Sequence, residues 1–388
     1  MRILMLSDVY FPRVNGVSTS IETFRRCLPA HGISVDLVTP RYGHEGEEPG
    51  ITRLPGWRLP FDPEDRLIRW PLLARWLEKE AGHYDLIHIQ TPFAAHYCGL
   101  SAARRAGVPV VATYHTLFEE YLQHYAPFLP GGWLRRQARL LSRRQCNALD
   151  ALIVPSTAMR DRLGEYGVSC PMQVLPTGIP IKQFKQADGA AFRLRHGIVS
   201  TRPVALFVGR VAHEKNIGFL LEAVSHARYR RPDLLLLIAG EGPAVPALKA
   251  QVRSLRLEQH VQFIGYLDRA RELPGCYAAA DAFVFASRTE TQGLVLLEAM
   301  ASGTPVVALS AMGTADILDP GQGCVTPPDN PLLFGDALAD LLSRPPLLKR
   351  LSDEAVLQAE AWSDQATAAR LADFYRQFGA SESRSLAA

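Results

Sequence analysis

The stretch AFVFASRTETQGLVLLEAMASG, residues 282–303, carries the main information about the fold. It begins with an apolar run that ends at Ser287, continues through the polar loop RTETQG, and finishes in an apolar segment closed by Gly303. An apolar run without alternation is typical of a strand that is buried on both faces of a parallel sheet. The segment after Gly293 has helical character, so the stretch predicts one strand–loop–helix unit of an α/β domain.

Outward from this unit, short apolar runs alternate with longer amphipathic segments along the whole chain. Segments of that length suit the crossover helices that connect parallel strands. We therefore expect two α/β domains, each a doubly wound Rossmann-like sheet. The runs expected to form strands are RILMLS (2–7), VDLVTP (35–40), LIHIQ (86–90), PVVATYH (109–115), ALIVPS (151–156), PVALFVGR (203–210), LLLLIAGEG (234–242), VQFIGY (261–266), AFVFAS (282–287) and PVVALS (305–310).

The boundary between the domains is best placed in VLPTGIPIKQF (174–184), which contains two prolines and one glycine. Such residues interrupt regular structure, and the next apolar run starts only at residue 203. We therefore expect an N-terminal domain over 1–180 and a C-terminal domain over 181–362. Residues 363–378 predict a final helix with Ser363 or Asp364 as its N-cap, which is expected to pack back on the first domain.

Composition narrows the class of protein. With 47% hydrophobic and 21% charged residues, the chain has the profile of a soluble globular protein, and a net charge of +3 gives no reason to expect nucleic acid as a partner. The six cysteines show no C-x-x-C spacing, which favours free thiols in a reducing cytoplasm. The absence of a signal core or an 18-residue apolar run favours a cytoplasmic location, with peripheral contact on the inner face of the membrane left open.

The opening stretch also suggests a ligand. A helix that starts at Gly293 offers free N–H groups and a positive dipole to a phosphate. Glu290 in the loop and Glu298 in the helix offer carboxylates to the paired hydroxyls of sugars. The alternative is that both are ordinary glutamates near a helix start. The functional interpretation predicts a nucleotide sugar, with one carboxylate for each end and the helix start for the diphosphate.

The sequence of residues 287–308 is similar to the E-x7-E motif of retaining GT-B glycosyltransferases, specifically of glycosyltransferase family 4. The resemblance extends over the chain through SDVYFPRVNGVSTSI, the strand ending in YHT, FVGRVAHEKNI, AGEGP and FIGY. It implies a GT-B fold, with two Rossmann-like domains facing across a deep cleft: an acceptor-binding N-terminal domain over 1–180 and a nucleotide-sugar-binding C-terminal domain over 181–362. It also implies that the donor is bound by the motif residues Glu290, Thr291, Gln292, Gly293, Leu294 and Glu298.

The same resemblance assigns roles outside this motif. Arg210 and Lys215 follow a strand and match the cations that bind the donor diphosphate and stabilise the leaving nucleotide. His115 matches the histidine that hydrogen-bonds the donor sugar near the reaction centre, although a lone histidine at a strand end is more often structural. Gly16 matches a glycine whose N–H approaches the phosphate, but the position before it, glycine in many relatives, is Asn15 here.

Tyr266 and Leu267 lie where the resemblance places the nucleobase, which is held largely by backbone groups. The chain contains no D-x-D sequence, the pair that commonly holds a metal ion in glycosyltransferases of the other major fold. We therefore expect no metal and no other cofactor, with Arg210, Lys215 and the helix start supplying positive charge. The resemblance implies retention by same-face attack, with the leaving phosphate taking the acceptor's proton.

Two segments bear on the acceptor. GGWLRRQARLLSRRQ (131–145) predicts a basic amphipathic helix, with Leu134, Ala138 and Leu141 on one face and Arg136, Arg139 and Arg143 on another. Such a helix suits an anionic membrane surface, although a solvated helix packed on its own domain is an equal alternative. RLPGWRLPFDPEDRLIRWPLLARW (53–76) mixes three Trp with five Arg, as an interface does, or contributes to a buried core.

The segments TETQG and YHTLFEEYLQHYAP (114–127) resemble bacterial glycosyltransferases that add glucose to diacylglycerol, and also mannosyl- and sulfoquinovosyl-transferring relatives. We therefore expect a hexose to move from a donor of the UDP-glucose or GDP-mannose type to a lipid. The alternatives are a soluble or cell-envelope glycan acceptor, a nucleotide-sugar 2-epimerase and a non-enzymatic sugar-nucleotide sensor. A phosphorylase would need a pyridoxal-phosphate lysine, for which the sequence gives no persuasive candidate.

Overall fold

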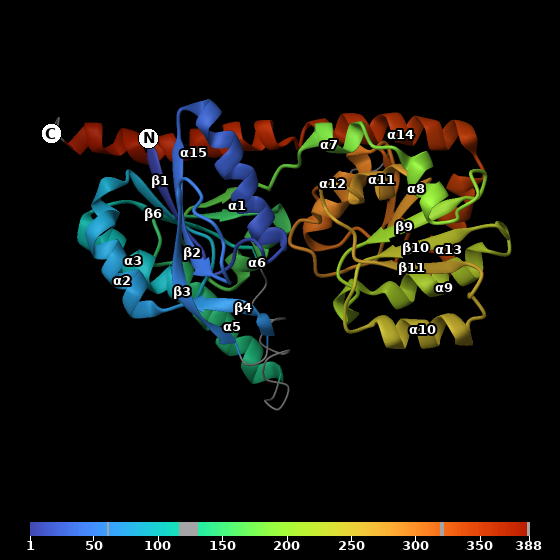
Figure 1. Cartoon of the computed structure of the whole chain (residues 1–388), viewed down its shortest axis with the longest axis horizontal. Coiled ribbons are helices and arrows are strands. Elements are labelled where there is room, and N and C mark those ends of the chain that lie inside the picture. Colours follow the sequence, from blue (N-terminus) through green and yellow to red (C-terminus); the bar gives the residue numbers. More distant parts are fainter. Residues whose placement is uncertain (60–61, 116–130, 319–321, 386–388) are drawn as a thin grey trace. The chain divides into compact units, whose positions relative to one another are not determined.

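The computed structural model describes residues 1–59, 62–115, 131–318 and 322–385, and the chain divides into two compact units. The N-terminal unit comprises Met1–Gly178 together with Asp364–Ala388, and the C-terminal unit comprises Ile179–Ser363. In each unit, helices cover both faces of a central sheet (Figure 1). The chain thus leaves the N-terminal unit after Gly178 and returns to it at Asp364.

Within the described residues, the N-terminal sheet has eight strands in the order β4-β3-β2-β1-β5-β6-β7-β8. All neighbours are parallel except β3 and β4, which form an antiparallel pair at one edge. The chain reverses its direction of progress across the sheet between β1 and β5, and ligands of such sheets bind at this point. The strands are β1 Arg2–Leu6, β2 Ser34–Arg41, β3 Ile51–Leu59, β4 Asp62–Ile68, β5 Leu86–Ile89, β6 Val110–Thr113, β7 Ala151–Val154 and β8 Met172–Val174.

Two helices of this unit, α1 and α6, begin at side chains that cap them. Asn15 accepts a hydrogen bond from the Ser18 amide at the start of α1, and Ser156 accepts one from the Met159 amide at the start of α6. The helices are α1 Gly16–Cys27, α2 Trp70–Glu80, α3 Ala94–Ala106, α5 Gly131–Cys146, α6 Thr157–Glu165 and α15 Asp364–Ser385, with short 3-10 turns η1 Leu28–His31 and η2 Ala81–His83.

Helix α15 is held in the N-terminal unit by its apolar face. Ala368, Leu371, Ala372 and Tyr375 are fully buried and belong to the same core as strand β1. The Tyr375 hydroxyl also lies 2.6 Å from Nδ1 of His88, a buried residue of β5. This last helix is therefore an integral part of the N-terminal fold.

The C-terminal sheet is wholly parallel over the described residues, in the order β11-β10-β9-β12-β13-β14. This is the strand order of a dinucleotide-binding Rossmann fold, and its switch point lies between β9 and β12. The strands β9, β10, β12 and β13 are buried throughout, as the unbroken apolar runs predicted. The strands are β9 Val204–Val208, β10 Leu235–Ala239, β11 Val261–Gly265, β12 Ala282–Phe285, β13 Val306–Ala308 and β14 Cys324–Val325.

Two glycines let the loops after β9 and β10 touch. A Cβ on Gly240 would lie 1.9 Å from the Gly209 carbonyl oxygen, and one on Gly242 would lie 2.4 Å from that of Val211. Both glycines also have positive φ, so the AGEGP turn requires them. The helices of the unit are α7 Ile181–Lys185, α8 Gly189–Arg195, α9 Ile217–Ala227, α10 Val245–Ser254, α11 Leu273–Ala278, α12 Leu294–Ala301, α13 Pro331–Leu342 and α14 Pro345–Glu360, with η3 His213–Lys215 and η4 Met312–Thr314.

The prediction of two doubly wound α/β domains is confirmed, and each of the ten expected strands is present. Four strands were missed: β3, β4, β8 and β14. The first two lie largely in the Arg- and Trp-rich stretch 53–76, where Trp57 and Trp70 are about half exposed rather than part of a core. All six cysteines are free and buried, as expected.

Candidate functional site

The switch point of the C-terminal sheet brings three of the predicted site residues together. Strands β9 and β12 are parallel neighbours, so the loops that follow them leave from the same edge. Arg210 and Lys215 lie in the loop after β9, and Glu290 lies in the loop after β12. The Lys215 ammonium donates a hydrogen bond to Oε1 of Glu290 at 2.5 Å. Both side chains are largely sheltered from solvent, so this pair is preorganised at the strand ends.

Glu214, which the sequence did not single out, holds the remaining cation. Its Oε1 accepts a hydrogen bond from Nη2 of Arg210 at 2.8 Å. Burial raises the pKa of the Glu214 carboxyl, but the hydrogen bond and charge of Arg210, with help from Lys215, outweigh that and keep the pKa below its usual value. The Arg210 side chain itself remains about half exposed. Two cations and two carboxylates therefore form two ion pairs in the loops at this edge of the sheet.

The start of α12 lies beside this cluster. Gly293 caps the helix with φ of 94° and no side-chain hydrogen bond, so the first amides of α12 have no partner within the helix. The loop before it, Thr291 and Gln292, packs tightly against Gly313, where a Cβ would lie only 2.0 Å from the Thr291 carbonyl oxygen. Leu294 is the first residue of the helix. The geometry is that of an anion site at a helix N-terminus.

The structure places Glu298 differently from the expectation that it faces a sugar. Its side chain is completely buried, because the segment from Leu296 to Ala301 packs into the core. Its two oxygens accept hydrogen bonds from Nη2 of Arg269 and from the Tyr277 hydroxyl, the latter at 2.8 Å. Arg269 follows β11 and covers the carboxylate, while a third of its own side chain remains exposed. A diol therefore reaches Glu298 only if Arg269 moves.

Tyr266 and Leu267 follow β11 directly. The Tyr266 side chain is 60% exposed, whereas Leu267 is buried in the core of the C-terminal unit. Gly265 before them has φ of 73°, which turns the chain at the end of the strand. The exposed ring and the turning backbone provide a surface on the unit that carries Arg210, Lys215 and Glu290.

His115 and Gly16 belong to the N-terminal unit. His115 follows β6, and its Nε2 lies 2.8 Å from Oε1 of Gln90, which follows the neighbouring strand β5. Gly16 is the first residue of α1 and nothing lies within 4 Å of the position its Cβ would take, so its backbone is open to a ligand. Gln90 was missed, although its place at the end of the run LIHIQ was a usable signal.

Burial fixes the charge state of His115. It lowers the pKa of the imidazole to about 4, so the ring is neutral at physiological pH. Because Oε1 of Gln90 can only accept, Nε2 of His115 carries the proton and Nδ1 does not. The ring is therefore neutral, with its Nε2 proton directed at Gln90.

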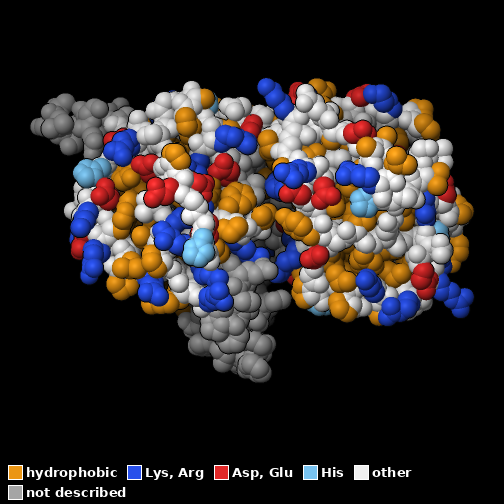
Figure 2. All heavy atoms as spheres, viewed as in Figure 1, with side chains coloured by type: hydrophobic (Ala, Val, Ile, Leu, Met, Phe, Trp, Pro, Cys, Tyr) orange, Lys and Arg blue, Asp and Glu red, His pale blue; other side chains and the backbone are white. Residues whose placement is uncertain are grey.

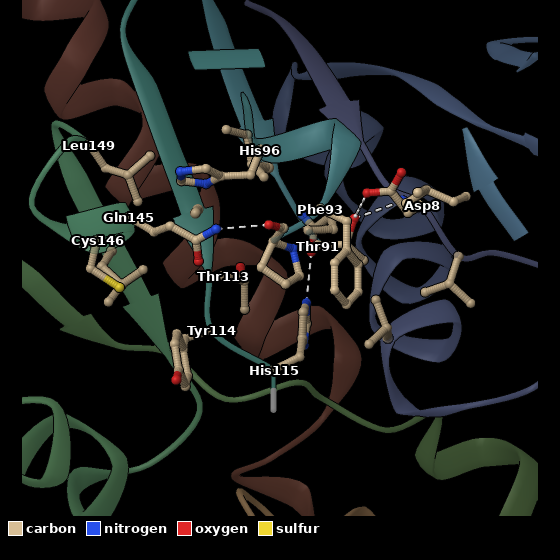
Figure 3. A pocket seen from close by; sticks show the side chains of 18 of the residues that line it. Asp8, Thr91, Phe93, His96, Thr113, Tyr114, His115, Gln145, Cys146 and Leu149 are labelled. Carbon is tan, nitrogen blue, oxygen red and sulfur yellow. Dashed lines mark hydrogen bonds between the residues drawn. The ribbon is translucent and has the colours of Figure 1, made fainter. Parts of the chain in front are cut away.

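A cavity of about 220 Å³ lies within the N-terminal unit, next to His115. Figure 3 shows it lined by side chains from the loop after β1 and from β5, β6, α3 and α5. Asp8 lies on its wall, where Oδ2 accepts hydrogen bonds from the Thr91 hydroxyl at 2.9 Å and from the Ala95 amide at 3.0 Å. Burial raises the pKa of Asp8 to about 6. Sequence analysis did not identify this cavity, because its walls come from strands and helices far apart in the chain.

The surface of the N-terminal unit carries exposed apolar groups beside arginines. On α5, Leu140 and Leu141 are 38% and 39% exposed, next to the exposed Arg143 and Arg144. Of the apolar residues predicted to share one face, Ala138 is buried and Leu141 is exposed, and no side chain is described for Leu134; the buried positions of the helix include Ala138, Ser142, Gln145 and Cys146.

Charges of both signs and hydrophobic groups are interspersed on the faces seen in Figure 2, without a large patch of one sign. This agrees with the modest net charge of +3. Within the described ranges, no helix combines the length and apolar character needed to cross a bilayer.

Comparisons with known proteins agree with this architecture. The family model described as "Glycosyltransferase Family 4" matches residues 14–183, and that described as "Glycosyl transferases group 1" matches residues 190–357. An alpha-monoglucosyldiacylglycerol synthase of Streptococcus pneumoniae is 35% identical over 79% of this chain and 71% of the relative. The protein of the same description from Acholeplasma laidlawii is 29% identical over 79% of this chain and 80% of its own.

Solved structures share the fold at lower identity. HepE of Anabaena in complex with UDP superposes with a TM-score of 0.79 at 20% identity, covering 97% of this chain and 100% of HepE. Sucrose-phosphate synthase of Thermosynechococcus elongatus gives 0.78 at 22% identity, covering 98% and 99% of the two chains. Two Rossmann-like units in one chain are therefore an architecture shared with these proteins.

Proposed function

This chain belongs to glycosyltransferase family 4, and we propose that it moves a hexose from a nucleotide-diphosphate sugar to a hydroxyl of a membrane lipid such as diacylglycerol. The donor is of the UDP-glucose or GDP-mannose type. The observation that supports this most directly is the convergence of Arg210, Lys215 and Glu290 beside the start of α12. A diphosphate needs such cations and amides, and a sugar needs such a carboxylate.

On the donor side, Arg210, Lys215 and the first amides of α12 neutralise the diphosphate. Glu290 accepts hydrogen bonds from sugar hydroxyls, and the Lys215 ammonium holds its carboxylate in place. The nucleobase lies against the backbone near Tyr266 and Leu267. The ribose reaches Glu298 after Arg269 has turned away, which its partly exposed side chain allows. Gly16, at the open start of α1, presents its N–H to the phosphate.

In the reaction we propose, the bond between the anomeric carbon and the diphosphate oxygen breaks while the acceptor oxygen bonds to that carbon on the same face. The acceptor's proton passes to the leaving phosphate, so the configuration is retained. The transition state carries oxocarbenium character in the sugar and negative charge on the leaving group. Arg210 and Lys215 stabilise that negative charge. His115, neutral at physiological pH, hydrogen-bonds the donor sugar near the reaction centre.

We propose that the reaction requires no metal ion. The charge that a divalent cation would supply comes instead from the two side-chain cations and the dipole of α12. Both cations already stand at the sheet edge, each oriented by a carboxylate. Activity should therefore persist after exhaustive dialysis against EDTA.

On the acceptor side, the similarity to alpha-monoglucosyldiacylglycerol synthases supports a diacylglycerol-type lipid. The exposed Leu140 and Leu141 beside arginines on α5 support peripheral contact with an anionic membrane on its cytoplasmic face. A lipid acceptor stays in the bilayer, so an enzyme that uses it must reach the surface. Both observations point to the same acceptor class.

The test is transfer itself. Purified protein is incubated with UDP-glucose or GDP-mannose labelled in the sugar and with vesicles that contain diacylglycerol, and the label in the organic extract is counted. Label from one donor identifies the base and the sugar class together and supports the lipid acceptor. Label in the aqueous phase on added soluble sugars, with none in the extract, would replace the lipid by a glycan. Conversion of the donor to an epimer without any acceptor would contradict the transferase assignment.

A further inference from the structure

The two strands that carry the candidate donor site separate before their loops begin. The parallel ladder between β9 and β12 ends where Leu206 pairs with Phe283. Lys215 and Glu290 lie further along the two loops, so the regular backbone hydrogen bonds of the sheet no longer fix the distance between them. Other contacts must therefore hold the two loops at the spacing at which the Lys215 ammonium meets the Glu290 carboxylate.

Asn216, which directly follows Lys215, provides one of these contacts. It precedes helix α9 with φ of 54°, in the left-handed region that asparagine enters more readily than most residues. Asparagine is among the best residues for capping a helix start, yet its side chain makes no capping hydrogen bond to α9. Its Nδ2 donates instead to the Ala286 carbonyl oxygen at 3.1 Å, just beyond the end of β12. The side-chain amide thus joins two loops rather than capping its own helix.

Ser287 provides a second contact, from the opposite loop. Its hydroxyl donates a hydrogen bond to the Glu214 carbonyl oxygen at 3.2 Å. Ser287 and Ala286 are both completely buried, so neither group can pair with water instead. Asn216 and Ser287, which we call the loop clamp, therefore tie the residues on both sides of Lys215 to the end of β12.

The loop clamp acts on Lys215, because Glu290 is also held from another direction. The Glu290 carbonyl oxygen accepts a hydrogen bond from the Gly313 amide at 2.9 Å, in the turn η4 after β13. The Lys215 ammonium, by contrast, stands at the end of a long flexible side chain, and ordering such a chain opposes the contact. A fixed backbone on both sides of Lys215 reduces the disorder that the contact has to overcome.

We infer that Asn216 and Ser287 are positioning residues, which fix the loop after β9 so that the Lys215 ammonium stands against Glu290 in readiness for the diphosphate. This rests on the proposed function, which it deepens. A cation that is already in place stabilises a leaving diphosphate more than one that must be ordered during the reaction. Neither residue has to touch the donor for this effect, so both act on the reaction through Lys215.

The test is a double-mutant cycle with Lys215. Asn216→Gly keeps the left-handed backbone, which glycine adopts freely, and removes the side-chain amide. The kcat of transfer and the calorimetric affinity for the nucleotide, titrated as UDP and as GDP, should each fall about two- to tenfold, as the loss of one neutral hydrogen bond predicts. In a Lys215→Met background, Asn216→Gly should change neither by more than about twofold, because the cation to be positioned is absent.

Two further variants complete the cycle. Ser287→Ala removes the other contact and should show the same dependence on Lys215, which keeps the test decisive if Asn216→Gly folds poorly. Arg256→Gly is the matched control, because Arg256 has the same φ of 54° at an exposed position of the same unit. It should leave kcat and nucleotide affinity unchanged.

Three outcomes overturn the inference: unchanged kcat and affinity in both clamp variants, losses as large in the Lys215→Met background as in the wild type, or an equal loss in Arg256→Gly. The second of these would make the loop clamp a structural feature only. Transfer by the wild type with losses that do not depend on Lys215 would keep the proposed function and remove the clamp. Nucleotide binding that depends on both Asn216 and Lys215, without transfer to any acceptor, would keep the clamp and remove the proposed function. Absence of both nucleotide binding and transfer would remove both.

Discussion

At the scale of single residues, Glu290 has two tasks in the proposed reaction, because it both faces the donor sugar and orients Lys215. Glu290→Gln keeps the shape and removes the charge. A hydrogen bond to a charged group contributes about 1.5–3 kcal/mol, so we expect kcat to fall about ten- to a hundredfold. Nucleotide affinity should change much less, since Arg210 and α12 remain. Steady-state kinetics with the labelled donor measures both, and Glu222→Gln, at an exposed position of α9 in the same unit, is the control.

A normal kcat in Glu290→Gln would contradict the role assigned to Glu290. A parallel loss of nucleotide binding and of transfer would instead make Glu290 a structural partner of Lys215 only.

Asp8 gives a prediction about pH. Burial raises the pKa of its carboxyl from 3.8 to about 6, so the folded state prefers the neutral form. The neutral Asp8 carboxyl makes its full contribution to the stability of the fold below pH 4, and this contribution is lost as the pH rises through 6. Asp8→Asn keeps an acceptor for Thr91 and the Ala95 amide and never becomes charged. Its advantage in unfolding free energy over the wild type should grow between pH 4 and pH 7 by about 3 kcal/mol.

Urea denaturation at a series of pH values, followed by tryptophan fluorescence, measures this difference. A difference between the two proteins that is independent of pH would mean that the Asp8 carboxyl is solvated and that the cavity wall is open to water.

At the scale of secondary-structure elements, a substitution at the start of α12 should have an effect on ligand binding that the same substitution at its end does not have. Gly293 and Gly303 flank this one helix, with φ of 94° and 75°, and a Cβ would meet its nearest neighbour at 3.1 Å and 3.3 Å respectively. Alanine at either position should therefore destabilise the protein by a similar amount, about 1 kcal/mol. Only Gly293→Ala should also weaken UDP binding, because only that end presents amides to the diphosphate.

Thermal unfolding and calorimetric titration with UDP provide the two measurements. Equal UDP affinities in Gly293→Ala and Gly303→Ala would place the diphosphate away from the start of α12.

How much the sequence predicts also differs between elements. The β12–α12 unit is predictable because an unbroken apolar run, a positive-φ glycine and an apolar helix follow one another locally. The β3–β4 pair is not, because its strands contain prolines and arginines and lie at the sheet edge, where burial imposes no apolar pattern. Strand β14 has only two residues, too few for any pattern.

The same limit applies within the candidate site. That Lys215 and Glu290 meet follows from strand ends that share one edge of a sheet. That Arg269 covers Glu298 does not follow, since it depends on how the loop after β11 folds over a buried helix face. The contact between Gln90 and His115 is predictable only in part. Both positions are strand ends, but nothing in the chemistry of a glutamine would single it out as a site residue.

At the scale of the whole molecule, the charge and the exposed apolar groups of the N-terminal unit bear on where the enzyme works. A net charge of +3 is too small to hold the protein on a membrane alone, since each basic residue near an anionic surface contributes about 1 kcal/mol. Insertion of apolar side chains has to add to it. Leu140 and Leu141, exposed beside Arg143 and Arg144, combine both contributions on one helix.

We therefore expect the protein to sediment with vesicles that contain phosphatidylglycerol and much less with neutral vesicles. Raising the salt from about 0.1 M to about 1 M shortens the screening length from about 10 Å to about 3 Å and should release most of the bound protein.

The double variant Leu140→Asp/Leu141→Asp should bind at least about tenfold more weakly, because two apolar contacts are lost and two repulsive charges are added. Leu357→Asp is the control, since Leu357 is 67% exposed on α14 of the C-terminal unit. Equal binding of both variants would show that α5 does not touch the membrane. If their transfer to short-chain, water-soluble diacylglycerol also stayed equal to that of the wild type, the lipid would reach the enzyme by another surface while the chemistry remained as proposed.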